Sequence, residues 1–274
     1  MEKNIIRALP KDIPQDVRLS LEKWDNYYKE ILQNKTYEAE KRAYDQVYLK
    51  DTLDQIFEYY HLRENDTYLE IGCGPMFLGQ ELAKRGLRVI GIDFSLSALV
   101  IAQKMLEERG LKNYLLIQTD IQSMPLREKT VDLIYGGGVI EHFRDTDAVV
   151  AEMYRVLKKG GICFNTVPQL NLGSLTYRQV WGNIPNFPIL KQIAEFVHIK
   201  LLQKRYMRFG YELSFGKRAL KRIFQKHGFE RVEIKKFRCY LSFRYLKFSW
   251  LKALAQKLSR LELFNPMVFV VAKK

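Results

Sequence analysis

The sequence has little of what would indicate a disulfide framework, a zinc site or a membrane span. Its three cysteines, Cys73, Cys163 and Cys239, show no paired spacing, and free thiols are typical of a reducing cytoplasm. No uncharged apolar run approaches the roughly 20 residues that cross a bilayer, and residues 1–8 lack the apolar core of a signal peptide. We therefore expect a soluble, cytoplasmic protein, which at 274 residues can build one large α/β domain with additions.

Aspartate is missing from the last part of the chain, where no Asp follows Asp147. Residues 171–274 carry 22 Lys and Arg against five Glu, a net charge of +17, whereas residues 1–170 have a net charge of −3. A field of one sign attracts anions such as nucleic acid, an acidic membrane surface or a phosphorylated substrate. Any single lysine could merely solvate a helix face, but the lack of aspartate favours an anionic partner.

Among the features that are present, a glycine turn between two predicted strands is the most informative. Residues 68–75 read Tyr-Leu-Glu-Ile-Gly-Cys-Gly-Pro, and the next apolar stretch ends at Asp93. A carboxylate about 20 residues beyond a glycine turn is the arrangement that holds a ribose diol. The third glycine of a dinucleotide fingerprint is missing, because residue 77 is Phe, and Glu70 would attract a cation rather than a phosphate. The turn suits a nucleoside with a positive amino-acid tail, although a plain strand-to-helix turn is the alternative.

The apolar pattern predicts a doubly wound parallel sheet. Residues 12–62 have a helical period, and short apolar strands then alternate with helices. The predicted strands are 67–71, 88–92, 114–118, 131–135 and 161–167, and the predicted helices are 76–86, 95–109 and 145–158. Continuous apolar strands of this length are expected where helices cover both faces of a sheet.

Beyond residue 168 the alternation breaks. We expect a loop at 169–188, a basic amphipathic helix at 189–209, a helix at 216–226 and strands at 229–235 and 266–273. Between the last two strands, Trp250, Leu254, Leu258 and Leu261 form an apolar stripe with basic residues around it.

Several motifs, in order, resemble those of class I S-adenosylmethionine-dependent methyltransferases, in particular the small-molecule subgroup with ubiquinone-pathway and sugar O-methyltransferases. They are Glu70-Ile-Gly-Cys-Gly-Pro, Asp93, Thr119-Asp120-Ile, Gly138-Val-Ile-Glu141-His142 and Tyr154-Arg-Val-Leu-Lys-Lys-Gly-Gly161. The resemblance implies a mostly parallel, seven-stranded α/β sheet with helices on both faces. It would follow an N-terminal helical extension at 1–62, so that the methyltransferase domain occupies 63–274. Helical insertions would follow strand 5, at 169–210, and lie between strands 6 and 7, at 237–265.

The resemblance also implies roles for individual residues, with S-adenosyl-L-methionine as the cofactor. Glu70, Gly72 and Gly74 would face its methionine portion, and Asp93 would take both ribose hydroxyls. Phe94 and Ile121 would pack on the adenine, Asp120 would accept from its amino group, and Gly136 to Gly138 would line the pocket beside the sulfonium. Asp120 could instead be only a turn residue and Phe94 only a core residue.

The acceptor is expected to be an oxygen, methylated without a metal. The exit of the fourth strand, Tyr135-Gly-Gly-Gly, differs from the Asn-Pro-Pro-Tyr type that acts on amide nitrogens, and the adjacent Asp-Asn pair of a catechol-type metal site is lacking. His142 is the candidate base, because a neutral imidazole can take a proton near pH 7; a helix cap is its alternative role. Asn171 and Tyr177 are candidate contacts to the acceptor.

Both insertions are expected at the active-site mouth, because ligands of open α/β sheets bind at the carboxyl ends of the strands. Residues 169–210 and 237–265 would form a basic cap that accepts a small-molecule or lipid-linked acceptor. The helix at 250–263 would contact the acidic inner face of a membrane peripherally. An RNA methyltransferase would also explain the basic surplus, although no RNA-binding module is recognisable. A catalytically inactive cofactor-binding regulatory protein is the other alternative.

Overall fold

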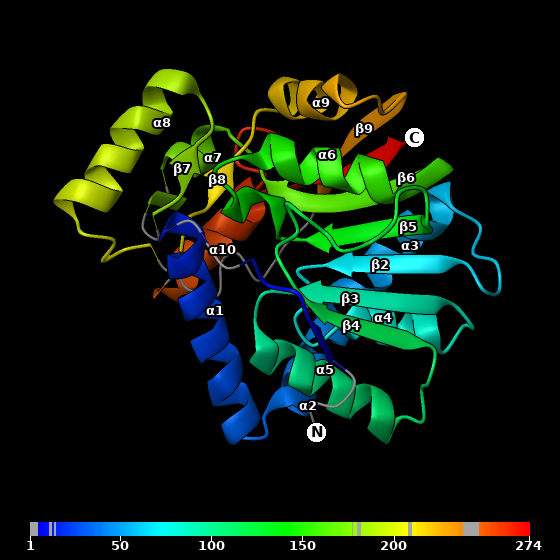
Figure 1. Ribbon diagram of the computed structural model, residues 1–274. Coiled ribbons are helices and arrows are strands. Elements are labelled where there is room, and N and C mark those ends of the chain that lie inside the picture. Colours follow the sequence, from blue (N-terminus) through cyan, green and yellow to red (C-terminus); the bar gives the residue numbers. More distant parts are fainter. Residues whose placement is uncertain are drawn as a thin grey trace.

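The structure, a computed structural model, describes residues 5–10, 13, 15–176, 178–179, 182–207, 210–237 and 247–274 (Figure 1). Tyr177 and Cys239 lie outside the described residues. Within this part of the chain, no helix combines the length and the apolar character that crossing a bilayer would require.

The centre of the fold is an eight-stranded sheet with the order β1-β4-β3-β2-β5-β6-β10-β9. Its strands are β1 (Ile5–Arg7), β2 (Thr67–Ile71), β3 (Arg88–Asp93), β4 (Tyr114–Gln118), β5 (Val131–Gly137), β6 (Leu157–Pro168), β9 (Arg231–Phe237) and β10 (Met267–Lys273). Only β10 runs against its neighbours, β6 and β9. The predicted doubly wound, mostly parallel sheet is confirmed, with strand boundaries that shift by a few residues.

The sheet has eight strands rather than the predicted seven. The additional strand, β1, pairs in parallel with β4, and Ala8 N donates to Gln118 O at 2.8 Å. The three residues of β1 are too few to show an alternating pattern, so only the tertiary partner reveals the strand. β1 covers the edge of β4, which would otherwise expose unpaired backbone groups.

Helices cover both faces of the sheet. On one face lie α3 (Lys50–Tyr59), α4 (Phe77–Ala83) and α5 (Leu96–Glu108), and on the other lie α6 (Thr146–Val156) and α9 (Lys217–Lys226). Strand β2 shows how the sequence produces this layering, since Tyr68 packs with the α3 to α5 layer while Leu69 and Ile71 pack with the α6 to α9 layer. A parallel strand that is buried on both faces must be apolar on both.

The two insertions gather at the end of the sheet to which the parallel strands point (Figure 1). They contain α7 (Leu172–Leu175), β7 (Ile184–Pro185), α8 (Pro188–Glu195), the π-helical η4 (Phe196–Leu201) and α10 (Ser249–Leu258). β7 pairs in parallel with β8 (Leu213–Ser214), just beyond the first insertion. The predicted helix at 189–209 ends at Leu201, and Gln203 and Lys204 have φ angles of 46° and 63°. A right-handed helix cannot pass through two such residues.

The N-terminal extension contains α1 (Gln15–Gln33), α2 (Tyr37–Tyr44) and the π-helical η1 (Asp45–Leu49) before α3. α1 packs on α5 and crosses the same end of the sheet as the insertions (Figure 1). The site at that end is therefore enclosed by segments from both ends of the sequence, the helix α1 near the N-terminus and the insertions that follow β6 and β9.

Candidate active site

The glycine turn after β2 is built for a close approach of its backbone. Gly72 and Gly74 have φ angles of +53° and +50°, and a Cβ added at Gly72 would lie 2.6 Å from Val139 Cγ2. Cys73 N donates to Ile92 O at 2.9 Å, which fastens the turn to β3. Glycine is thus required by the backbone angle and by the space at residue 72.

Glu70 lies buried at the end of β2. Its Oε2 accepts hydrogen bonds from the Tyr68 hydroxyl, at 3.0 Å, and from Gly79 N, at 2.8 Å. Burial raises the pKa of Glu70 to about 8, and the nearby Asp93 acts in the same direction. A cation placed beside Glu70 would favour the ionised carboxylate.

Asp93 closes the turn from the next strand. Its Oδ2 accepts from Gly74 N at 2.7 Å, and its Oδ1 accepts from Ser95 N at 2.8 Å. Burial raises the pKa of Asp93 to about 6 despite these hydrogen bonds. The carboxylate therefore orders the turn and faces the pocket at the same time.

Two adjoining pockets follow the carboxyl ends of the strands. The nucleoside pocket has an empty volume of about 800 Å³, and the tail pocket has about 680 Å³. The lining of the nucleoside pocket includes Ser20, Leu21, Trp24, Asp93, Phe94, Ile121, Gly138, Val139, His142 and Phe143. The lining of the tail pocket includes Tyr27, Glu40, Tyr44, Glu70, Pro75 and Tyr135. Both share Tyr28, Gly72 and Gly137, so together they fit an elongated ligand with a nucleoside end and a cationic end.

Helix α1 supplies one wall, which the sequence interpretation missed. Trp24 and Tyr28 stack at 6.2 Å between ring centroids, and a Cβ at Gly74 would lie 2.5 Å from the Tyr28 hydroxyl. Asp25 holds the helix in place, since its Oδ1 accepts from Ser95 Oγ at 2.7 Å. The available signal was the density of aromatic residues in the helix.

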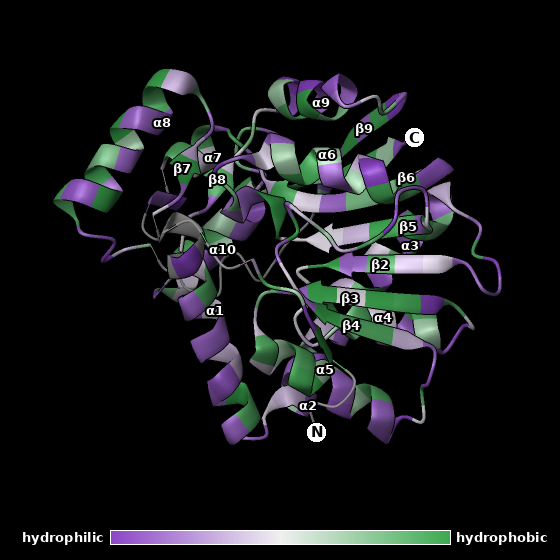
Figure 2. Cartoon of the chain, in the orientation of Figure 1, coloured by the Kyte–Doolittle hydropathy of each residue, from purple (hydrophilic) through white to green (hydrophobic). Residues whose placement is uncertain are grey.

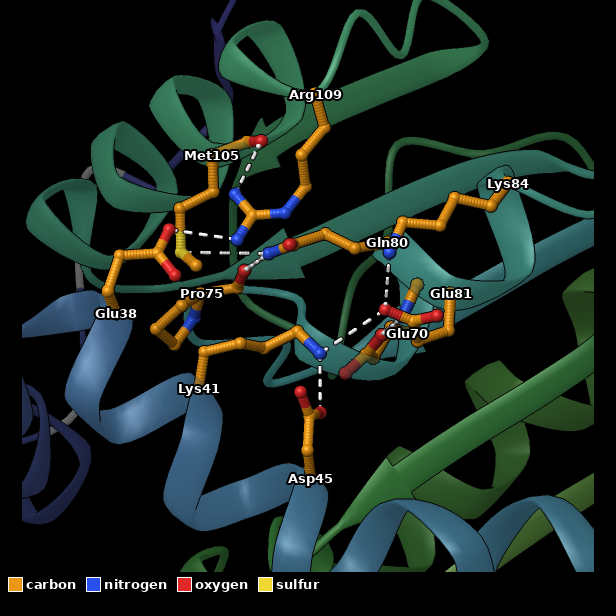
Figure 3. A network of polar contacts seen from close by, with 11 residues as sticks. Glu38, Lys41, Asp45, Glu70, Pro75, Gln80, Glu81, Lys84, Met105 and Arg109 are labelled. Carbon is orange, nitrogen blue, oxygen red and sulfur yellow. Dashed lines mark hydrogen bonds and ion pairs between the residues drawn. The ribbon is translucent and has the colours of Figure 1, made fainter.

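A polar network beside the tail pocket joins α2 to α4 (Figure 3). The buried Lys41 Nζ forms ion pairs with Asp45 and, at 3.3 Å, with Glu81 Oε1, which also accepts from Lys84 Nζ at 2.8 Å. Gln80 Nε2 donates to Pro75 O at 2.9 Å, so α4 also holds the glycine turn. The N-terminal helices are thereby fixed against the turn.

His142 lies in the short 3₁₀ helix η2 (Ile140–His142), at the pocket wall. Its Nδ1 is 2.7 Å from Tyr211 O. Because a carbonyl oxygen only accepts, Nδ1 carries the hydrogen and Nε2 keeps its lone pair. Burial lowers the pKa of His142, although Glu212 opposes this effect, and the Trp24 ring meets the imidazole edge-on at 5.9 Å. The imidazole is therefore neutral near pH 7, with Nε2 able to accept a proton.

The remaining predicted residues divide into two groups. Phe94, Ile121 and Gly138 line the nucleoside pocket, where Phe94 and Phe143 stack at 6.4 Å. Asp120 and Gly136 do not line either of the two pockets: Asp120 Oδ1 accepts from Gln122 N at 2.8 Å, and a Cβ at Gly136 would meet Asn165 Oδ1 at 2.6 Å.

Asn171 is engaged within the cap. Its Nδ2 donates to Glu262 O, at 3.0 Å, and to Asn265 O, at 2.8 Å, while its Oδ1 accepts from Ser174 N at 3.1 Å. The side chain thus joins α7 to the segment after α10, and an acceptor contact by Asn171 stays a prediction. The same contact predicted for Tyr177 falls outside the described residues.

Comparison with known proteins agrees with this geometry. The model of a methyltransferase domain family matches residues 69–165. The demethylmenaquinone methyltransferase of Oceanobacillus iheyensis is 29% identical over 201 residues, which cover 69% of this chain and 78% of that protein. The malonyl-acyl-carrier-protein O-methyltransferase of Hamiltonella defensa is 30% identical over 139 residues, which cover 50% of this chain and 51% of that protein.

A solved structure shows the same fold. Phosphoethanolamine N-methyltransferase 2 of Haemonchus contortus, in complex with phosphomonomethylethanolamine and S-adenosylhomocysteine, superposes with a TM-score of 0.62 at 19% identity. The match covers 90% of this chain but only 60% of that longer one. The sheet, the two pockets and the family match lead to one conclusion: residues 69–165 form a methyltransferase domain, and the chain is an S-adenosylmethionine-dependent methyltransferase, similar to class I small-molecule enzymes, with S-adenosyl-L-methionine as its cofactor.

Proposed function

We propose that the protein transfers a methyl group to an oxygen of a small-molecule, sugar or lipid-linked acceptor without a metal, with His142 as the base. The observation that carries this proposal is the hydrogen bond between Nδ1 of His142 and Tyr211 O, at 2.7 Å, in a ring that lines the nucleoside pocket. It fixes the tautomer in which Nε2 can take a proton. Because the bonded oxygen belongs to the backbone of Tyr211, no carboxylate has to accept from Nδ1 to hold this tautomer.

The residues of the two pockets suit the cofactor. Glu70 and Gly72 would hold the amino-acid end, Asp93 the ribose hydroxyls, and Phe94 and Ile121 the adenine. Asp120, buried next to Ile121, would accept from the adenine amino group after a small rearrangement. S-adenosylmethionine supplies a methyl group already activated by its positive sulfur, so the chain has to align the acceptor and remove its proton.

The pocket wall around His142 indicates an acceptor with an apolar body. Leu21, Trp24, Val139 and Phe143 line the same pocket as the imidazole. An apolar wall with one base selects a hydroxyl on a ring or hydrocarbon frame over a free sugar or nucleotide. The relatives named for demethylmenaquinone and for a malonyl-carrier conjugate support an acceptor that is attached to a lipid or a carrier.

Label transfer tests the acceptor class. The protein is incubated with a bacterial lipid and metabolite extract and with cofactor that is radiolabelled in the methyl group, and the products are then partitioned between organic and aqueous phases. We expect the label in the organic phase, stable to mild alkali as an ether would be. Label that remains in RNA would instead support the RNA methyltransferase, and cofactor binding without any transfer would support the regulatory alternative. The Asp93→Ala variant serves as the blank.

Glu70→Gln is expected to weaken cofactor binding by about tenfold or more above pH 8 and to remove its pH dependence there. Since the pKa of Glu70 is about 8, binding of the ammonium group to the wild type should release a proton near neutral pH. Wild-type affinity should therefore rise as the pH increases through about 8. Calorimetry with S-adenosylhomocysteine, in buffers of different ionisation enthalpy, measures both the affinity and the proton release.

The same variant should be more stable than the wild type when no cofactor is bound. Burial raises the pKa of Glu70 from 4.5 to about 8, so the folded state binds more protons than the unfolded state in that window and loses stability as the pH rises through it. Glu108→Gln, at the exposed end of α5 where its carboxylate lies 3.8 Å from Lys104 Nζ, is the control and should leave cofactor affinity unchanged. An equal loss of affinity in both variants would contradict the role of Glu70.

We also propose a cytoplasmic location with peripheral contact at the acidic inner face of the membrane. The support is the basic C-terminal part of the chain together with the exposed apolar residues of the cap.

A further inference from the structure

Exposed apolar side chains are concentrated in the cap, the insertions at 169–210 and 237–265. Of the sixteen large apolar side chains that are exposed in the described residues, fourteen belong to the cap, and the other two are Ile6 and Phe57. α8, η4 and the residue before α8 expose Phe187, Ile189, Ile193, Phe196 and Leu201, with exposed fractions of 53% to 66%. α10 and the residues on either side of it expose Phe248, Trp250, Leu254, Leu261 and Leu263, with exposed fractions of 44% to 66%. Apolar exposure of this extent marks an interaction site.

The same two segments present positive charge. Residues 187–207 contain four basic residues, Lys191, Lys200, Lys204 and Arg205, and residues 247–263 contain Lys247, Lys252, Lys257 and Arg260. Among the described residues, the structure shows no ion pair for any of these eight. Figure 2 shows hydrophilic and apolar residues in close succession along α8, at the rim of the molecule.

The acidic residues of these two segments form hydrogen bonds and ion pairs with other residues of the protein. Glu195 is the only one in 187–207, and its Oε1 accepts from the Tyr211 hydroxyl at 2.6 Å and lies 3.5 Å from Arg144 Nε. Glu262 is the only one in 247–263, and it pairs with Lys217 at 2.5 Å and with Lys236 at 3.3 Å. The charge that both segments present outward is therefore positive.

We propose that α8 with η4 and α10 form two arms that dock the protein on the anionic surface of a bilayer, with their apolar side chains inserted at the level of the headgroups. Aliphatic and aromatic residues with a cationic rim fit acidic phospholipids, in which the hydrocarbon and the charge lie at neighbouring depths. RNA fits less well, because aliphatic side chains such as Ile189, Ile193 and Leu254 outnumber the aromatic ones on the arms and offer no ring on which a base could stack.

The docking arms adjoin the active site. The inference therefore rests on the proposed function, and it identifies the acidic bilayer as the place from which the acceptor reaches that site. Glu195, in the last turn of α8, binds the hydroxyl of Tyr211, and the backbone oxygen of Tyr211 holds His142. The ring of Tyr211 also lies under Arg144, at 5.6 Å. An acceptor whose tail remains in the bilayer would therefore have its head next to the base.

Cosedimentation with vesicles of phosphatidylglycerol and phosphatidylcholine tests the inference, with vesicles of phosphatidylcholine alone for comparison. We expect binding to the acidic vesicles that weakens as salt is added. The Ile189→Glu/Ile193→Glu variant and the Leu254→Glu variant should each lower the partition coefficient by about tenfold or more. Phe57→Glu, an exposed apolar position outside the cap, should bind as the wild type does.

Two triple variants with the same change in net charge distinguish docking through the arms from attraction of the whole positive protein to the acidic vesicle. Lys191→Glu/Lys200→Glu/Lys204→Glu should lower binding by about a hundredfold or more. Arg218→Glu/Lys221→Glu/Arg222→Glu, on α9, changes the net charge equally and should lower binding far less. An equal loss of vesicle binding in both variants would overturn the inference, because the net charge alone would then explain the binding.

Two further measurements decide the remaining outcomes. Light scattering without lipid should give the mass of a monomer for both the wild type and the Ile189→Glu/Ile193→Glu variant. If the wild type is instead a dimer that this variant dissociates, a second copy covers the arms and the inference is overturned. Calorimetry of cofactor binding should be unchanged in every cap variant. Absence of vesicle binding in a wild type that still binds cofactor and transfers methyl groups would overturn the inference alone, whereas absence of cofactor binding would overturn the proposed function.

Discussion

His142→Gln is expected to lower kcat by about 10² to 10⁴-fold while it leaves the affinity for the cofactor unchanged. Glutamine is similar in length and can still donate to Tyr211 O, the partner of His142 Nδ1 at 2.7 Å, but it provides no nitrogen that takes a proton. The loss should appear in single-turnover methyl transfer to the acceptor that label transfer identifies. Calorimetry with S-adenosylhomocysteine measures the affinity separately.

The pH profile adds a signature that a structural role would not produce. Burial lowers the pKa of His142 below its usual value of 6.5, and the base acts only when it is neutral. Wild-type kcat should therefore be level at neutral pH and fall only in acid, whereas the residual activity of the variant should lack this acid limb. His227→Gln, a surface histidine whose Nε2 lies 3.0 Å from Asp147 Oδ1, is the control. Unchanged kcat in His142→Gln would leave His142 only the role of capping the chain.

The parts of the site that could be predicted from the sequence are those in which one short segment determines the geometry. Gly72 must be glycine because its backbone has a positive φ and Val139 fills the space of a Cβ. Asp93 follows because a parallel strand ends beside the turn in any doubly wound sheet. Turn chemistry and strand order therefore place these residues without knowledge of distant contacts.

The parts that could not be predicted depend on contacts between distant segments. Trp24 has the periodicity of any core-facing helical residue, and only the packing of α1 across the strand ends brings it to 5.9 Å from His142. Lys41 reads as a solvated charge, yet it is buried against Asp45 and Glu81. β1 is likewise a strand only because the edge of β4 accepts it. A helical or apolar pattern states which face is buried but not what buries it.

The predicted acceptor contact in the cap shows that the contacts of a single side chain are equally hard to predict from the sequence. Asn171, a predicted contact to the acceptor, follows the end of β6 at Pro168, and ligands of α/β sheets bind at such strand ends. In the structure its amide instead meets the backbone of residues 262 and 265. A sequence pattern cannot distinguish a polar side chain that meets a ligand from one that satisfies buried backbone groups, because both needs select the same residue types.

Asp93→Ala is expected to weaken cofactor binding by about a hundredfold or more. The variant removes a carboxylate that would accept from two ribose hydroxyls, and hydrogen bonds to a charged group contribute about 1.5–3 kcal/mol each. It also frees Gly74 N and Ser95 N, which Asp93 holds at 2.7 and 2.8 Å, so the turn loses part of its order before any ligand arrives. Calorimetry with S-adenosylhomocysteine gives the affinity, and thermal unfolding shows whether the variant is folded under those conditions.

Asp93→Asn and Asp132→Asn separate the contribution of the ribose hydrogen bonds from that of the ordered glycine turn. Asparagine at 93 can still accept one backbone N–H, so the turn should be nearly normal while affinity remains low if the charge matters for the ribose. Since burial raises the pKa of Asp93 to about 6, wild-type affinity should fall as the pH drops through that value, and the Asp93→Asn variant should lose this dependence. Asp132 also holds a backbone N–H, that of Thr67 at 2.9 Å, but at the opposite end of β2; its asparagine variant should bind the cofactor normally. Equal losses at both positions would attribute the effect to stability rather than to the ribose, and would leave Glu70 as the main anchor of the cofactor.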